Sequence, residues 1–240
     1  MELNLISLGV VYTLTFDVLN PSLGLGDTGI NFLRSLYLKA INVSGDILEY
    51  LLSECRLLER LHVEGSDALV RWKVFDSSCK LKKLTIFCCR KLEELEIDAV
   101  NLLYLRFRTP SPYTNVVFKN MPVLAEAMFG GSGLSTSTPI FRQLSHITTQ
   151  ISKLTLDFFG LSIPIRVLPT FCKLEQFTLM VQDEMKFDIV VINQFLKAFP
   201  MLREFTLEIT WPSDELEREG NGLEQVNPSI QDFVAVNKYT

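Results

Sequence analysis

The chain has 240 residues, of which 48% are hydrophobic and 21% are charged, a composition typical of a globular protein and unlike that of a disordered one. The formal net charge of −5 argues against a general nucleic-acid binder, which would carry a basic excess. No run of about 18 or more apolar residues occurs, so no membrane-spanning helix is expected.

The compartment can be inferred from the N-terminus and the cysteines. The apolar segment 5–14 has the length of a signal-peptide core, but only an acidic residue, Glu2, precedes it as a charge, and no small-x-small cleavage site follows. The five cysteines are odd in number and lack the spacing of a disulfide framework, which fits a reducing compartment. We therefore expect the protein in the cytoplasm or the nucleus.

One phrase, Leu-x-x-Leu-x-Leu with apolar substitutes, recurs along most of the chain. Most copies begin 22 to 28 residues apart, which is the period of leucine-rich repeats. The opening Leu3-x-Leu5 looks like the end of one more copy. The copies begin at Leu33, Leu58, Leu81, Leu92, Leu102, Leu124, Ile151, Leu174 and Leu202.

The alternation within each phrase predicts the fold. Successive side chains of a strand face opposite sides, so the apolar positions point inward and stack on those of the neighbouring copies. The pattern predicts an α/β leucine-rich-repeat solenoid with a curved parallel sheet and irregular, partly helix-free repeats. The steps from Leu81 to Leu92 to Leu102 are only 11 and 10 residues, which predicts strand, tight loop and strand. One buried inward column is expected to consist of Leu36, Leu61, Leu84, Leu95, Leu105, Leu154, Phe177 and Phe205.

The longer repeats leave room for helices on the convex side. Helical spacing of apolar residues predicts helices within 44–55 and 187–200, and a further helix over about 139–148 after a glycine- and serine-rich loop at 130–138. The apolar faces of the first and last of these helices consist of Ile47, Leu48, Leu51 and Leu52, and of Ile192, Phe195, Leu196 and Phe199.

The adjacent cysteines Cys88 and Cys89 raise the question of a metal or redox site. Cys89 falls at the ninth position of the repeat phrase, where a small side chain turns into the core. Zinc would require paired Cys-x-x-Cys elements or nearby histidines, and the chain has only two histidines, His62 and His146. We expect the cysteines to pack as small apolar side chains and to bind no metal. Those just before a following phrase are Cys55, Cys79 and Cys172.

No phosphate loop, nucleophile elbow or metalloprotease motif is present, and "GLGDTG" at 24–29 is interpreted as a turn. Carboxylates on predicted strands could suggest acid–base pairs, but a parallel ladder would place them beside cations. Glu94 would neighbour Lys83 and Tyr104. Glu96 would neighbour Thr85 and Arg106, and Asp98 would neighbour Phe87 and Arg108. The sequence therefore predicts a protein that is not an enzyme and has no cofactor.

The outward positions of the predicted sheet suggest a binding surface. Exposed aromatic and arginine side chains are the residue types that anchor protein interfaces. The segment from Arg56 to Lys91 holds nine Lys/Arg against four Asp/Glu, while 183–240 holds eleven acidic residues against five basic ones, a contrast that could orient a partner. The candidate binding residues on the concave face are Arg60, His62, Lys83, Phe87, Tyr104, Arg106 and Arg108, with Tyr37 and Lys39 beside them.

Four segments resemble the repeat region of plant F-box/leucine-rich-repeat proteins. They read "LRSLYLKAINVSGDILEYLLSECRLLERLHV", "LKKLTIFCCRKLEELEIDAVNLLYLRF", "VVFKNMPVLAEAMFG" and "ISKLTLDFFG". The resemblance covers residues 1–211, which we interpret as the leucine-rich-repeat domain. Residues 212–240 are interpreted as an acidic C-terminal tail outside the repeat.

In that family an F-box binds the Skp adaptor of an SCF-type ubiquitin ligase, and the repeats capture the protein to be ubiquitinated. The resemblance thus implies a recognition module for an unknown protein substrate, with a Skp-type adaptor as partner only if an F-box lies upstream, because Met1 falls inside a repeat. Two alternatives stay open: a repeat segment of a plant immune receptor, and a small-molecule co-receptor pocket on the concave face. No nucleic acid and no membrane partner is expected.

Overall fold

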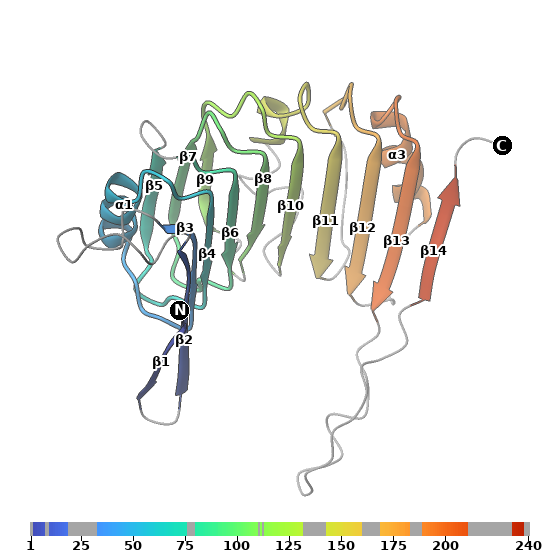
Figure 1. The fold of residues 1–240 in the computed structure, drawn as a ribbon. Coiled ribbons are helices and arrows are strands. Elements are labelled where there is room, and N and C mark those ends of the chain that lie inside the picture. The colour runs from blue at the N-terminus through green and yellow to red at the C-terminus, as the bar shows by residue number, and fades with distance from the viewer. Residues whose placement is uncertain are drawn as a thin grey trace, which may run out of the picture.

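The repeats distribute their strands between two sheets. The computed structural model describes residues 2–7, 10–18, 33–75, 80–109, 111, 113–131, 143–159, 169–182, 189–210 and 232–237. The main sheet has eleven strands in the order β1-β2-β3-β4-β6-β8-β10-β11-β12-β13-β14, and a second sheet has three, in the order β5-β7-β9 (Figure 1). From β3 to β13 the main sheet is parallel throughout, as the repeat pattern predicts.

The chain alternates between the two sheets over its first half. The strands of the main sheet in this part are β3 (Leu33–Lys39), β4 (Arg60–Glu64), β6 (Lys83–Phe87), β8 (Tyr104–Arg108) and β10 (Glu126–Gly131). Between them lie β5 (Arg71–Phe75), β7 (Glu94–Asp98) and β9 (Asn115–Phe118) of the second sheet. One solenoid turn over this stretch therefore contains a strand on each side.

The second half continues the main sheet with β11 (Lys153–Phe159), β12 (Gln176–Gln182) and β13 (Glu204–Thr210). Antiparallel strands flank both ends. At the N-terminal end β1 (Glu2–Ser7) pairs with β2 (Val10–Val18), which pairs with β3, and at the other end β14 (Asp232–Asn237) pairs with β13. The expectation that Leu3-x-Leu5 ends a parallel repeat copy is wrong, because β1 runs antiparallel to its neighbour.

The inward column of the main sheet is confirmed with one correction. In strand register it consists of Leu36, Leu61, Leu84, Leu105, Ala127, Leu154, Phe177 and Phe205, and all are buried. Leu95 is buried as predicted, but it lies on β7 and stacks between Trp72 and Val116 in the second sheet. The residue of the main column between Leu105 and Leu154 is Ala127.

The placement of β7 also corrects the predicted carboxylate neighbours. Glu94 pairs in register with Arg71 and Asn115, and Glu96 pairs with Lys73 and Val117. Asp98 lies opposite Phe75. None of these three carboxylates is next to β6 or β8, so the expected pairs with Lys83, Arg106 and Arg108 are wrong.

Strand β5 was not predicted, although its signal is present. Leu69-x-x-Trp72-x-Val74 is the repeat phrase with tryptophan at the second apolar position, and all three side chains are buried. A search that admits tryptophan would have found it. In β9, Val116 and Phe118 are buried in the same alternating pattern, but an exposed Tyr113 takes the first position of the phrase.

Two of the predicted helices form. In α1 (Gly45–Glu54), Leu48 and Leu52 are buried and Leu51 is half-buried, but Ile47 is 51% exposed, so its expected place on the apolar face is wrong. In α3 (Ile189–Ala198), Phe195 lies 5.0 Å from Phe177 between ring centroids, and the following Phe199 lies 4.8 Å from it. This aromatic cluster packs α3 against the inward face of β12.

The third predicted helix and its loop lie partly outside the described residues. Within 139–148 residues 139–142 are not described, Gln143 is helical, and the 3-10 helix η2 (Leu144–His146) and a turn follow it. Gly130 and Gly131, which were expected in the loop, belong to β10, and residues 132–138 are not described.

On each edge strand of the second sheet, a backbone N–H group donates a hydrogen bond to a side chain of a flanking segment. On β5, the backbone N–H of Lys73 donates to Oε1 of Glu49 on α1 at 3.1 Å. On β9, the N–H of Phe118 donates to Oε1 of Gln143 at 3.2 Å. Unpaired edge N–H groups invite further strands, so these two bonds help to limit the second sheet to three strands. Gly45 permits the approach of α1, because a Cβ there would meet the carbonyl oxygen of Arg71 at 1.9 Å.

A first test concerns the two columns. Leu95→Ala should lower the free energy of unfolding by roughly 2–5 kcal/mol, because it removes a fully buried side chain between Trp72 and Val116. Chemical denaturation measures the change. Leu103→Ala is the matched control, since Leu103 is 43% exposed and its truncation should change stability by only about 0.5 kcal/mol. Equal effects of the two substitutions would contradict the second column.

Candidate functional site

The main sheet turns one face toward the core and the other face outward. The core-facing side packs against α1, α3 and the second sheet, and all of these lie on that side (Figure 1). We call the other side of strands β3 to β13 the open face. It corresponds to the face expected to be concave.

Strand register arranges the open face in three rows. All seven candidate binding residues fall in these rows on β4, β6 and β8, which are neighbours in the sheet. The first row is Ser35, Arg60, Lys83, Tyr104, Glu126, Lys153, Gln176 and Glu204; the second is Tyr37, His62, Thr85, Arg106, Met128, Thr155, Thr178 and Thr206; the third is Lys39, Glu64, Phe87, Arg108, Gly130, Asp157, Met180 and Glu208. The structure thus brings the predicted residues together, while their role in binding stays a prediction.

Cations and aromatic rings are in direct contact on β6 and β8. The guanidinium carbons of Arg106 and Arg108 each lie 5.5 Å from the ring centroid of Phe87. Nζ of Lys83 lies 5.9 Å from the ring centroid of Tyr104. Cation–π contacts of this kind contribute about 0.5–1 kcal/mol at exposed sites, so they restrict the long side chains before any partner arrives. We call the group Arg60, Lys83, Phe87, Tyr104, Arg106 and Arg108 the aromatic–basic patch.

His62 belongs to a neighbouring polar cluster. Its ring stacks on that of Tyr37 at 5.6 Å between centroids, and its Nε2 lies 3.0 Å from a carboxylate oxygen of Glu64. Lys39 approaches the other oxygen of Glu64 at 3.1 Å. Burial raises the pKa of Glu64, but the hydrogen bonds from His62 and Lys39 outweigh it and hold the pKa below its ordinary value. The ionised carboxylate therefore fixes His62 in place.

Arg108 is neutralised by a buried acid. Its Nε lies 3.2 Å from Oδ2 of Asp157, whose side chain is only 1% exposed. Asp157 occupies an outward position of β11, next to Gly130 of β10. A Cβ on Gly130 would lie 2.7 Å from the Cβ of Asp157, so the missing side chain creates the space that the carboxylate fills.

Charge is divided between the two halves of the open face. The outward positions of β4, β6 and β8 carry Arg60, Lys83, Arg106 and Arg108 against one acid, Glu64. Those of β10 to β13 carry four acids against one cation, and these are Glu126, Asp157, Glu204 and Glu208 against Lys153. The open face therefore has a basic half and an acidic half.

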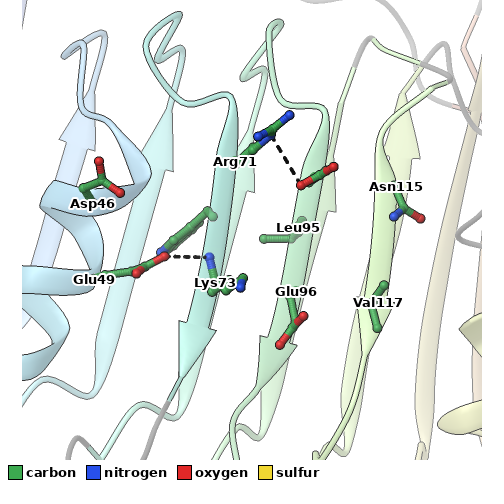
Figure 2. A pocket seen from close by; sticks show the side chains of 10 residues that line it. Asp46, Glu49, Arg71, Lys73, Leu95, Glu96, Asn115 and Val117 are labelled. Carbon is green, nitrogen blue, oxygen red and sulfur yellow. Dashed lines mark hydrogen bonds and ion pairs between the residues drawn. The ribbon is translucent and has the colours of Figure 1, made fainter.

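Two hollows lie on opposite sides of the molecule. A small one of about 70 Å³ lies on the open face and is lined by Tyr37, Arg60, Leu61, His62, Lys83, Thr85 and Tyr104. A larger one of about 420 Å³ lies between α1 and the outer side of the second sheet (Figure 2).

The charges of the larger hollow are of mixed sign and mostly engaged. Arg71 forms an ion pair with Glu94 at 3.4 Å, and Glu96 pairs with Lys119 at 2.6 Å. The carboxylate of Glu49 accepts the edge N–H of β5, as Figure 2 shows. These contacts hold the second sheet together, and we interpret this hollow as structural.

The cysteines that the structure describes are free thiols. Cys55 and Cys89 are buried, as predicted, whereas Cys88 is half-buried and Cys172 is exposed, contrary to the prediction; Cys79 lies outside the described residues. Burial, and then the negative charge of Glu54, raise the pKa of Cys55 to about 11. Burial also raises the pKa of Cys89. These two thiols are therefore poor nucleophiles, as core residues are.

The described residues contain no group of three or more His, Cys, Asp or Glu side chains placed to hold a metal ion. No helix among them is long and apolar enough to cross a membrane.

Residues 11–221 match the family model described as "At1g61320/AtMIF1, LRR domain". The chain belongs to this leucine-rich-repeat family. Leucine-rich-repeat domains of this kind are protein-interaction modules, built as stacked repeats with extended binding surfaces.

A curated relative of this chain is the "F-box/LRR-repeat protein At2g42730" of Arabidopsis thaliana, to which it is 37% identical over 82 residues. The aligned segment is 33% of this chain and 18% of the relative, so the chain spans well under two thirds of the relative's length. The resemblance to plant F-box/leucine-rich-repeat proteins is confirmed by these two findings.

The space beside Gly130 gives a second test. Gly130→Ala should lower the free energy of unfolding by about 1–3 kcal/mol, because the new Cβ displaces Asp157 from its place beside Arg108. Chemical denaturation of the single variant measures this loss. In the double variant Gly130→Ala with Asp157→Gly, the clash is gone, so the two losses should sum to more than the loss in the double variant. If the losses in free energy of unfolding of the two single variants add up to that of the double variant, the proposed contact between positions 130 and 157 is contradicted.

Proposed function

We propose that the open face captures a partner protein through the aromatic–basic patch, and that the domain is the substrate-recognition part of an SCF-type ubiquitin ligase. Capture of a partner is supported by one observation: arginine and aromatic side chains lie together on three adjacent strands, and Arg106 and Arg108 both contact the ring of Phe87. Arginine and tyrosine are enriched among residues that dominate binding energy, and restricted side chains lose less entropy on binding. The ligase role is supported by the relative, which is named an F-box/LRR-repeat protein.

The alternatives receive less support. A pocket for a small-molecule co-receptor ligand normally encloses about 300–1,000 Å³, whereas the hollow on the open face measures about 70 Å³. An immune-receptor segment would have the same solenoid, but the matched relative is described as an F-box protein. A protein partner of a ubiquitin ligase is therefore the proposal that fits these observations best.

The patch can be tested without disturbing the core. The double variant Phe87→Ala with Tyr104→Ala truncates two half-buried rings of the open face and leaves the inward leucines intact. Recovery of partner proteins by co-immunoprecipitation should fall about tenfold or more, as expected if either ring is a hot spot of roughly 2 kcal/mol. Melting curves of both proteins serve as the control. Unchanged recovery with a normally folded variant would exclude the open face and move the site to the convex side or to the 212–240 tail.

The ligase role needs a separate measurement, because capture alone does not imply degradation. In plant cells that express the full protein, the captured partner should disappear after translation is blocked, and more slowly when Phe87→Ala and Tyr104→Ala are present. A proteasome inhibitor should remove the difference. A partner that binds the wild type but turns over at the same rate in both lines would leave a recognition module and reject the ligase role.

A further inference from the structure

The aromatic–basic patch holds two cations that no carboxylate of the described chain neutralises. Lys83 contacts the ring of Tyr104, and Arg106 contacts the ring of Phe87. Among the described residues Nε of Arg106 is buried without a hydrogen-bond acceptor, and neither side chain forms an ion pair. A buried guanidinium N–H without an acceptor is costly, and a charged acceptor would relieve that cost.

The acids nearest to these cations are already engaged. Glu64 is held by Lys39 and His62, and Asp157 by Arg108. Glu126, which lies opposite Tyr104, pairs with Lys153 at 3.0 Å. None of them is available to Lys83 or Arg106 without the loss of another pair.

Lys83 lines the small hollow of the open face together with Thr85 and Tyr104. Arg106 is not one of its lining residues, but it lies next to the hollow, directly opposite Thr85 in the strand register. Arg60 also lines the hollow, and its Nε donates to Oγ of Ser35 at 2.5 Å. A hollow of about 70 Å³ exceeds the volume that one water molecule needs and is far below that of a drug-sized ligand. Tyr37, which also lines the hollow, is 41% exposed and offers an aromatic surface.

We infer that this hollow is an anion subsite that receives an aspartate or glutamate side chain from an extended acidic segment of the partner protein, with an aromatic side chain of the same segment packed on Tyr37. The inference rests on the proposed function and specifies the chemistry of the partner. From β3 to β8 the sheet advances three strand spacings, about 14 Å, which an extended segment of about five residues covers.

The charge distribution favours a short acidic segment of a protein over a nucleic acid. A long polyanion that crosses the open face would meet the acidic positions of β10 to β13, where Glu204 and Glu208 lie, on a chain of net charge −5. Like charges across an interface disfavour association, whereas a segment confined to β4–β8 meets mainly cations.

The test begins with a display library of random peptides about ten residues long, selected on the purified chain. We expect enrichment of aspartate or glutamate next to an aromatic residue. The best peptide is then synthesised and its affinity is measured for the wild type and for the variant Lys83→Glu with Arg106→Glu, which should bind about tenfold more weakly or worse. Salt should weaken the wild-type complex, because solvent-exposed charges are screened.

A matched control makes the same change in charge at a site away from the hollow. Arg90→Glu with Lys91→Glu replaces one arginine and one lysine that are exposed in the turn between β6 and β7. Peptide affinity should change less than about twofold in this variant. A peptide with lysine in place of its acidic residue should prefer the Lys83→Glu, Arg106→Glu variant over the wild type.

Several results would overturn the inference. They are a neutral or basic consensus, no selected peptide, equal losses in the two charge-reversal variants, or tighter binding of a single-stranded oligonucleotide than of the peptide. Failure here is distinguishable from failure of the proposed function. If the partner from co-immunoprecipitation is lost with Phe87→Ala and Tyr104→Ala but retained with Lys83→Glu and Arg106→Glu, the binding face stands and the anion subsite is rejected. If the partner is retained by both variants, both proposals are rejected.

Discussion

The structure depends on the register-matched stacking of apolar side chains from one solenoid turn to the next. A single turn has an apolar edge that it cannot bury alone, so each inward residue is covered by its counterparts one turn before and one turn after. In the main sheet this continuity runs from Leu36 to Phe205. Because the period along a strand is two, fixing the inward residues also fixes the outward ones. The binding face is therefore a consequence of the core.

The repeat and the inward side chains could be predicted from sequence because they are local properties of each phrase. Assignment of strands to sheets was harder, since β6, β7 and β8 carry the same phrase. The length of the connection between two strands decides whether both can lie in the same sheet. Parallel neighbours in one sheet need a crossover of a dozen or more residues, and only residues 88–93 connect β6 to β7. So short a connection cannot return to the starting edge of the same sheet, and β7 must join another one. The same limit places Leu95 in the second sheet.

The placement of β7 also decides the charge balance of the candidate site. Placing β7 between β6 and β8 would set Glu96 beside Arg106 and Asp98 beside Arg108, and the surface would look neutral. With β7 in the second sheet, Arg106 lies between Thr85 and Met128, and its charge is uncompensated. The seven candidate binding residues follow from the alternation of inward and outward positions along each strand. The ion-pair partner of Arg108 cannot be predicted in this way. Asp157 is 49 residues away, and its burial depends on the missing side chain of Gly130.

The two kinds of solenoid turn also shape the surface. A helix is about 10 Å wide, so turns backed by helices are spaced more widely behind the sheet than within it, and the sheet curves. Strands stack at about 4.8 Å on both sides of a turn. From β4 to β9 each turn is backed by a strand, so the two sides have equal spacing and impose little curvature there. The aromatic–basic patch lies over this stretch. The parallel register keeps the rings and guanidinium groups aligned across β4, β6 and β8, which lowers the entropy that a partner must overcome on binding.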